Sequence, residues 1–521
     1  MKNKIIKKEN LIYIILIIFS IFIGVILRAK LSNIYSLNSD MIEHYYHMRK
    51  YYDNKEIPVT GAYLAGGVYI ADEYNSNSEV FDESIPNIPG GYFYIEYMIY
   101  YFLGGENLYK ARILYFVAMA LFCFIFLFWI YKTFGIKILS IIASLIFVNI
   151  TFLTIGNRFY NPHTAFILSF ISIPIIMQYT VNKDIYIYIY SVLIFPLLAL
   201  ESMGHLATFF TIVPTMILYL IIRWQKTKKY IIPLLIGVFI SFILYLPYLI
   251  SEIQNNFTNL HNLINLKSAV KPIRQPPQIW SVLFFPTNEP NWNYGNGIMP
   301  IFNHWFNGSP LLIFSFVFYI ISIFIGLYSF VILIKDYFKK KLEDKENLIF
   351  KETALIYLLY IILTVIIFMI LNLGAARARY FLNIFPLTFM PLIYLIKKYK
   401  NKKLYKLLLI YAFLNPLAVY IQIFHIYENE DKSGWNFMMP HVEKIVEDAQ
   451  DKNFDLSTNS YYPYLLLKIE NKNFRIDSNA NIKYHLINSL SKEFDSSGMQ
   501  LIYSNKQYLT FKEYRINKNS D

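Results

Sequence analysis

The chain has 521 residues, of which 56% are hydrophobic and only 16% are charged, and its formal net charge is +13. Soluble domains contain about 45–50% apolar and about 25% charged residues, so this composition excludes an ordinary soluble protein. A positive charge of this size would favour a nucleic-acid partner in a soluble chain, but here Lys and Arg collect between apolar segments. The sequence therefore predicts an integral membrane protein that binds no nucleic acid.

Long apolar segments recur along the chain. A helix needs about 20 mostly apolar residues to cross the hydrocarbon core, and about eleven segments meet this requirement. The predicted spans are 11–28, 113–131, 136–155, 164–180, 185–200, 205–222, 231–250, 311–334, 353–372, 380–396 and 404–424. The first could be a signal peptide, but no small-residue cleavage site follows it, so we expect an uncleaved span. Segment 92–103 is short, rich in Tyr and carries Glu96, so we expect it in the interface.

The short connections between the spans predict the orientation. The N-terminus and every second connection together carry 23 Lys and Arg residues, whereas the short connections between them carry only Arg158, Arg377 and Arg379. Cytoplasmic loops carry the excess of Lys and Arg. We therefore expect a plasma (inner) membrane protein with a cytoplasmic N-terminus and its large loops, 29–112 and 251–310, outside.

The fold class follows as an all-α polytopic membrane bundle over 1–424 with a small extracytoplasmic α/β domain over 425–521. In this tail the pattern predicts, in chain order, a helix over 440–451, a strand over 453–457, a helix over 459–469, a strand over 473–477 and a hairpin of 500–504 with 508–511. No glycine-rich phosphate loop, paired CxxC or HExxH occurs, which disfavours ATP-driven transport and a zinc hydrolase.

The first outer segment carries a cluster of polar residues at helical spacing. Asp40, Glu43, His44 and His47 stand at i, i+3, i+4 and i+7, so a helix places them on one face. One interpretation is a helix cap followed by a solvated face. The other is a carboxylate above the membrane that serves as general base for a hydroxyl or amine acceptor. Such an acid could also hold a divalent cation.

Three further outer turns carry charges close to the apolar spans. Glu201 and His205 are four residues apart, and Glu201 either faces a water-filled cavity or pairs with His205. Arg158 either reaches lipid headgroups or joins the site. Arg377 and Arg379 lie outside against the charge bias, and guanidinium groups at the start of a helix suit phosphate oxygens.

These features resemble the C-type glycosyltransferases (GT-C fold), which take a sugar from a polyprenyl phosphate on the outer face. The resemblance covers nearly all of 1–425 and is most similar in general shape to the branch of protein O-mannosyltransferases, aminoarabinose transferases and Rgt-like transferases. It is carried by an outer acid after the first span, a second interfacial helix, and turns with Arg, Tyr and Pro. The residues concerned are Asp40, Ile88-Pro89-Gly90-Gly91-Tyr92, Arg158 with Asn161-Pro162, Tyr245 to Leu249 with Glu252, and Arg379-Tyr380 with Pro386.

The resemblance implies an inverting glycosyltransferase with a polyprenyl-phosphate sugar donor and a lipid, glycan or protein acceptor. Asp40 would be the base. The donor phosphate would bind to Arg379, Tyr380, Arg377 and Arg158. The acceptor cavity would be lined by Glu43, His44, His47, Glu201 and His205. No cofactor is required by this scheme, although Mg²⁺ or Mn²⁺ held by Asp40 and Glu201 stays open.

Three alternatives also stay open. A flippase or transporter of lipid-linked saccharides would need polar residues at the midplane and broken helices, and the apolar middles of the spans disfavour it. Oligosaccharyltransferase-like transfer to protein is a second, because the segment from Asp40 to Arg49 is similar to that enzyme's catalytic subunit. An outer polysaccharide polymerase or ligase is the third, although that class works from a large loop between late spans.

Overall fold

The structure is a computed structural model. It describes residues 10–34, 39–63, 86–149, 152–153, 160–182, 184–264, 311–370, 378–400, 403–430, 435–450, 453–458, 480–488, 496–504 and 508–514. Within these ranges, the side chains of 30–34, 39–43, 46, 63, 109, 368–370, 378–380, 422, 424–430, 435–439, 458, 488 and 508 are not described.

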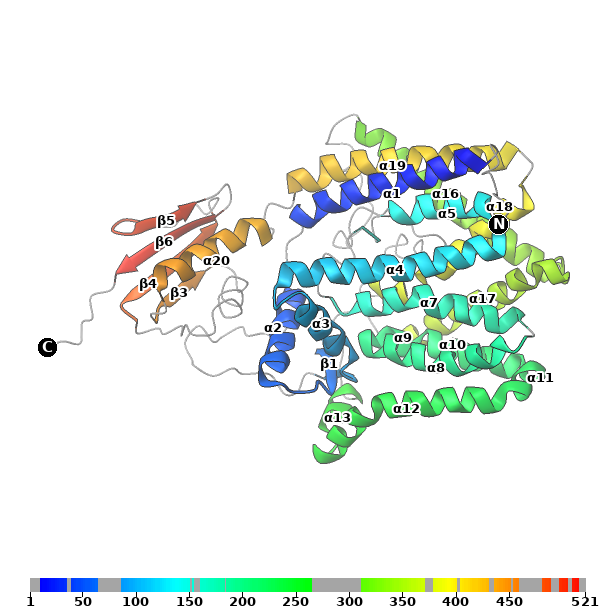
Figure 1. The fold of residues 1–521 in the computed structure, drawn as a ribbon, viewed down its shortest axis with the longest axis horizontal. Coiled ribbons are helices and arrows are strands. Elements are labelled where there is room, and N and C mark those ends of the chain that lie inside the picture. Colours follow the sequence, from blue (N-terminus) through cyan, green and yellow to red (C-terminus); the bar gives the residue numbers. More distant parts are fainter. Residues whose placement is uncertain are drawn as a thin grey trace, which may run out of the picture.

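Long antiparallel and parallel helices lie side by side in one bundle (Figure 1). They are α1 (Leu11–Ile34), α4 (Leu108–Phe134), α5 (Ile136–Phe147), α7 (Pro162–Val181), α8 (Tyr186–Gly204), α9 (Leu206–Phe210), α10 (Ile212–Ile222), α11 (Trp224–Thr227), α12 (Ile231–Gln254), α16 (Leu311–Phe338), α17 (Leu348–Ile370), η5 (Ala378–Phe389), α18 (Met390–Lys398) and α19 (Lys403–Glu430). In the described residues, 9 helical segments are long and apolar enough to span a membrane, and the predicted spans 136–155 and 205–222 hold shorter apolar helices. The predicted all-α polytopic membrane bundle is confirmed.

The helices of the bundle differ in how much of their apolar surface is buried. The helix α7 and the segment formed by η5 and α18 are almost entirely buried at the centre of the bundle, whereas α1, α4, α12 and α16 present large apolar side chains outward. Phe22, Phe239 and Phe324 are 62%, 61% and 67% exposed. Lipid tails solvate such side chains as well as a protein core does. The outer helices therefore need the membrane to cover them.

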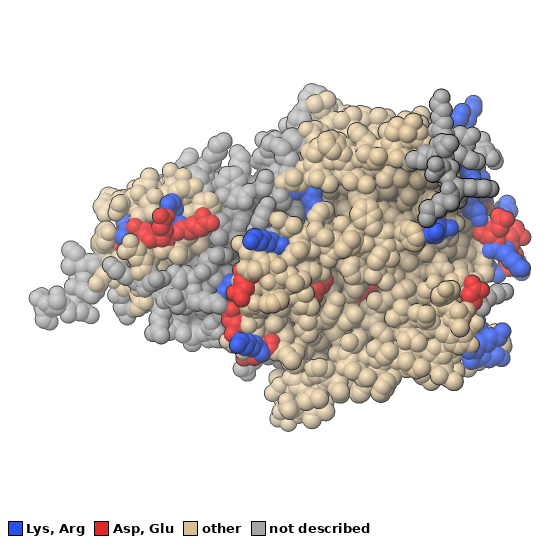
Figure 2. All heavy atoms as spheres, in the orientation of Figure 1, with Lys and Arg blue, Asp and Glu red and all other residues tan. Residues whose placement is uncertain are grey.

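Most charged residues gather at the two ends of the bundle, and the band between them shows only two small acidic patches on this face (Figure 2). At one end the connections 132–137, 223–230, 335–352 and 397–406 carry the lysines, and we call it the Lys-rich end. There Arg223 binds Glu352 through two hydrogen bonds of 2.9 and 3.0 Å, and Lys398 pairs with Asp336. The predicted clustering of basic connections on one side of the membrane band is thus present in the fold.

A small platform covers the opposite end, which we call the platform end (Figure 1). It consists of α2 (Ser39–Asn54), β1 (Thr60–Tyr63), β2 (Asn87–Pro89), α3 (Tyr92–Leu103) and α13 (Thr258–Ile264). Segment 92–103 is thus a short helix packed on α2 and not a span. Gly91 follows the β1–β2 pair, and a Cβ there would lie 1.8 Å from the carbonyl oxygen of Pro58, so only glycine fits. Asn259 of α13 bonds both backbone groups of Asn87, at 2.6 and 3.1 Å.

The C-terminal region forms a small α/β unit. It contains α20 (Trp435–Ala449), β3 (Asp455–Thr458), β4 (Ile482–Asn488), β5 (Gln500–Ser504) and β6 (Tyr508–Tyr514), in the sheet order β3-β4-β6-β5. The predicted helix 440–451, strand 453–457 and hairpin are confirmed. Strand β4, which pairs parallel with β3, was not predicted, and the predicted elements 459–469 and 473–477 lie outside the described residues. The division of the chain at 424 stays a prediction.

Candidate functional site

Helix α2 carries the polar cluster that the sequence singled out. Because Ser39–Asn54 is one helix, Asp40, Glu43, His44 and His47 share a face. The side chains of Asp40 and Glu43 are outside the described set. Those of His44 and His47 are only 5% and 8% exposed. A solvated face is therefore wrong for the two histidines, which point into the platform.

The ring of His44 connects α2 to α3 and to the turn before α7. It lies edge-on to Phe93, with ring centroids 5.0 Å apart, and stacks on Tyr160 at 6.1 Å. Tyr160 is itself fixed to α3, since its backbone N–H donates to the hydroxyl of Tyr97 at 3.0 Å. The hydroxyl of Tyr97 donates in turn to the Tyr160 carbonyl at 3.4 Å. Arg158, two residues before Tyr160, lies outside the described residues.

Glu96 of α3 is a buried acid that sequence reasoning did not assign to the site. The hydroxyl of Thr164, in the first turn of α7, donates to its carboxylate at 2.6 Å, and that of Tyr100 donates at 3.5 Å. Burial raises the pKa of Glu96 to about 7, although both hydrogen bonds oppose this shift. The signal in the sequence was a lone acid within an aromatic segment, which we took for an interfacial feature.

The outer ends of α7 and α8 meet directly beneath α3. A Cβ on Gly204, the last residue of α8, would lie 2.7 Å from Cβ of Thr164. Glu201 and His205 flank this contact and are 0% and 9% exposed. Neither carboxylate oxygen of Glu201 has a hydrogen-bond partner in the described part of the chain. The alternative in which Glu201 pairs with the His205 side chain is therefore wrong; only the His205 backbone N–H reaches the Glu201 carbonyl, at 2.9 Å.

A buried polar network lies near Glu201 and fixes η5. The Ser172 hydroxyl of α7 is close to the Glu201 carboxyl without forming a hydrogen bond of full geometry, and Tyr360 of α17 is close enough to interact with it electrostatically. Tyr360 donates to the side-chain oxygen of Asn383 at 3.1 Å, and the Asn383 amide donates to the hydroxyl of Thr211 at 3.0 Å. Asn383 thus holds η5 against α10 and α17. Hydrogen bonds that are buried in this way specify one register for the segment.

The start of η5 carries the predicted phosphate ligands. The backbone of Arg379 and Tyr380 is helical, their side chains are not described, and Arg377 lies outside the described residues. Phe385 packs on Phe166 of α7 with ring centroids 4.9 Å apart. Since a 3₁₀-helix rises about 2 Å per residue, the backbone of Arg379, the second residue of η5, lies roughly 12 Å nearer the platform end than that of Phe385 does. The structure therefore brings the segments of α2, α7, α8 and η5 that were singled out to one end of the bundle.

The described residues contain no cluster of side chains that could hold a metal ion. No group of three or more His, Cys, Asp or Glu side chains among them is close enough to hold an ion. Asp40, the first ligand of the predicted Mg²⁺ or Mn²⁺, is not among these side chains. Glu201 is present but has only hydroxyl groups facing it. The divalent cation stays a prediction.

We expect the stability of the protein to depend on pH through Glu96. The folded carboxyl has a pKa of about 7, above its usual value near 4.3. Between these values the folded protein holds a proton that the unfolded chain releases, so the free energy of unfolding falls as pH rises through this window. The total fall is on the order of 3 kcal/mol. Glu96→Gln should remove it.

The measurement compares apparent unfolding temperatures at pH 5 and pH 8 for the native chain and the Gln variant. The native chain should lose more stability at pH 8 than the variant does. Glu56→Gln, which changes an exposed acid of the platform, is the control and should leave the pH dependence intact. Equal pH dependence in Glu96→Gln and the native chain would contradict the assignment.

We expect the buried carboxyl of Glu201 to reduce the stability of the protein. A buried polar group without a partner costs about 1–3 kcal/mol, and Glu201 has none for either oxygen in the described residues. Glu201→Met, which has a similar shape, should therefore raise the unfolding temperature by a few degrees and at the same time lower activity. A variant that is less stable than the native chain would show that the carboxyl has a structural partner.

Two solved structures are similar to this chain over nearly its whole length, at low sequence identity. No protein-family model matches it, and no curated protein matches it in sequence. The crystal structure of ArnT from Cupriavidus metallidurans bound to undecaprenyl phosphate is similar, with a TM-score of 0.48 and 10% identity over 95% of this chain and 97% of that chain. The structure of the same protein in the apo state has a TM-score of 0.47 and 9% identity over the same shares.

Proposed function

We propose that this protein is a glycosyltransferase that moves a sugar from a polyprenyl-phosphate carrier to an acceptor at the platform end. The observation that carries the proposal is the position of α2. Its polar face is buried through His44 against Phe93 and Tyr160, and Asp40 stands one helical turn earlier on the same face. The backbone of Asp40 is thus one helical turn from the contact of α2 with α3 and with the turn before α7, and in this proposal its carboxylate faces the reaction there.

The orientation follows from the charges. The Lys-rich end faces the cytoplasm under the positive-inside rule, so the platform faces outward, as does the C-terminal unit. A polyprenyl tail lies along the apolar surface of the bundle, and its phosphate is then at the level of the platform. Arg379 begins η5 at this end, where a guanidinium matches phosphate oxygens in a bidentate manner.

The reaction is a single displacement with inversion at the anomeric carbon. Asp40 removes the proton from the acceptor hydroxyl or amine as that atom attacks. The new bond joins the acceptor atom to the anomeric carbon, the bond from that carbon to the carrier phosphate oxygen breaks, and the carrier leaves as a phosphate. Arg379, with Tyr380, Arg377 and Arg158, stabilises the charge that develops on the leaving group. Glu43, His44, His47, Glu201 and His205 are proposed to shape the acceptor side.

A flippase of lipid-linked saccharides is the second candidate. One observation favours it: Glu201 is buried in a helix of membrane-spanning length and has no hydrogen-bond partner in the described residues. Ionisable groups inside the membrane often mark transport pathways. Oligosaccharyltransferase-like transfer is a version of the first proposal in which the acceptor is a protein.

The test separates bond cleavage from movement of the carrier. The full chain is reconstituted in vesicles with lipid-linked sugars extracted from cells grown on a ¹⁴C-labelled sugar, so that the sugar need not be known. Native membranes supply the acceptors. A transferase releases polyprenyl phosphate and transfers the label to an acceptor, whereas a flippase moves the label across the bilayer with the carrier intact. Translocation without cleavage would overturn the proposal.

A further inference from the structure

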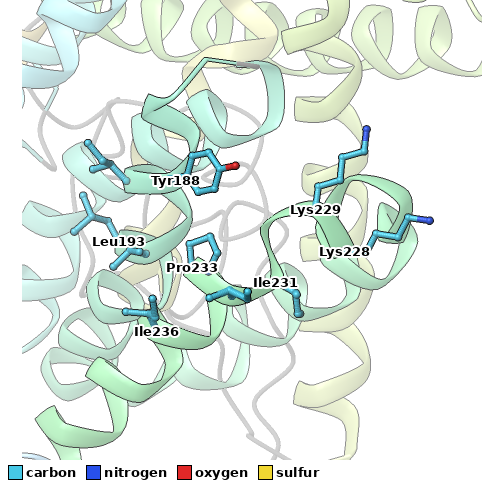
Figure 3. Close-up of a pocket in the computed structure, with 10 residues that line it drawn as sticks. Tyr188, Leu193, Lys228, Lys229, Ile231, Pro233 and Ile236 are labelled. Carbon is cyan, nitrogen blue, oxygen red and sulfur yellow. The ribbon is translucent and has the colours of Figure 1, made fainter.

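A groove runs between α8 and α12 on the outward surface of the bundle, close to the Lys-rich end (Figure 3). Its volume is about 640 Å³, within the range of small-molecule sites. The walls are apolar and include Ile189 of α8 with Ile232 and Ile236 of α12. These three side chains are 54%, 70% and 47% exposed, so the groove opens toward the lipid.

The close crossing of the two helices limits the groove at one end. A Cβ on Gly237 of α12 would lie 2.4 Å from the carbonyl oxygen of Val192 in α8. The absence of a side chain at Gly237 thus allows the two backbones to touch, as small residues do between membrane helices. All groove residues of α12 precede Gly237. The groove therefore extends from this crossing to the Lys-rich end.

The polar groups of the groove are confined to the end away from this crossing. Lys228 and Lys229 form a short 3₁₀ turn, η3 (Lys228–Tyr230), and both are exposed. Neither forms an ion pair with an acid in the part of the chain that the structure describes, whereas Lys398 and Arg223 at the same end each pair with a carboxylate. The Tyr188 hydroxyl is on the side of the groove that faces the two lysines (Figure 3).

We propose that this groove binds an anionic glycerophospholipid, with one acyl chain along the apolar walls and the headgroup phosphate on Lys228 and Lys229. The walls alone give no preference, because lipid tails are as apolar as Leu and Ile. The headgroup supplies the selectivity, since the two lysines carry positive charge to the level of the lipid phosphates and the Tyr188 hydroxyl can donate a third hydrogen bond. This site is at the opposite end from the proposed transfer site and does not depend on it.

The experiment measures lipid binding to the purified full chain by native mass spectrometry. The delipidated protein is titrated with palmitoyl-oleoyl phosphatidylglycerol and, separately, with phosphatidylcholine of the same acyl chains. Since each lysine contributes about fivefold, we expect the first phosphatidylglycerol to bind about twenty-fivefold more tightly than phosphatidylcholine. Lys228→Ala with Lys229→Ala should abolish this preference, and Ile232→Trp, which fills the groove, should weaken binding of both lipids.

Lys339→Ala with Lys340→Ala is the matched control, because these two adjacent lysines are exposed at the same end but do not line the groove. The control should keep the full preference. An equal loss in the control would reduce the effect to general surface charge and overturn the site. The proposed site is also overturned if the native protein shows no preference between the two lipids. It is overturned as well if undecaprenyl phosphate displaces phosphatidylglycerol from this site at equal concentration.

Discussion

Asp40→Asn should abolish sugar transfer while the protein remains folded and inserted. The variant keeps the shape of the side chain and its place in the first turn of α2 but cannot accept a proton. Loss of a general base costs about 10²–10⁴-fold in rate, which reduces transfer to background in a vesicle assay. The measurement is release of polyprenyl phosphate from the labelled carrier.

Asp53→Asn is the matched control for this prediction. Asp53 lies at the other end of α2, where its carboxylate is 3.6 Å from Arg49, and it has no part in the proposed reaction. Its substitution should leave the rate within about twofold. Full activity of Asp40→Asn would remove Asp40 from the mechanism and, with it, the argument from α2.

Arg379→Ala should lower the transfer rate by about 10²–10³-fold, the usual cost of losing one group that stabilises a developing oxyanion. Arg379→Lys should recover only part of this loss, because an ammonium keeps the charge but not the bidentate geometry of a guanidinium. The effect should appear in kcat as well as KM, since charge on the carrier phosphate grows as the bond to the sugar breaks.

Lys400→Ala, at the Lys-rich end of the same segment and exposed, should have no effect on either constant. An increase in KM alone for Arg379→Ala would mean that the residue binds the carrier without acting on the leaving group. Equal activity of the Ala variant and the native chain would contradict any role in phosphate binding.

The positions of the helices were accessible from the sequence because hydrophobicity is a property of each segment by itself. A run of apolar residues must become a helix in the bilayer, where no water can satisfy its backbone. Nine of the eleven predicted spans therefore overlap helical segments that are long and apolar enough to cross a membrane, whereas 136–155 and 205–222 hold shorter apolar helices in the described residues. The short segment 92–103 is the platform helix α3. Strand β4 was missed because its pairing with β3 joins Asp455 to Lys483 across a long stretch of chain.

The sequence predicted the candidate site only in part. Helical spacing placed Asp40 and His44 on one face of α2, but not the burial of His44. The sequence marked Glu201 as costly near the membrane, but not its lack of a partner. It gave no role to Glu96, whose partner Thr164 is 68 positions away in the chain.

What the sequence by itself determined is that this is a many-span membrane protein whose basic connections share one side. Those properties depend on local composition, and the charge pattern survives any arrangement of the helices. Only the tertiary structure decided which side chains meet at the platform end: His44 with Tyr160, Glu96 with Thr164, and Asn383 with Thr211. The physical reason is that a hydrogen bond or a ring contact needs two partners, and here the two partners come from segments that are far apart in the chain.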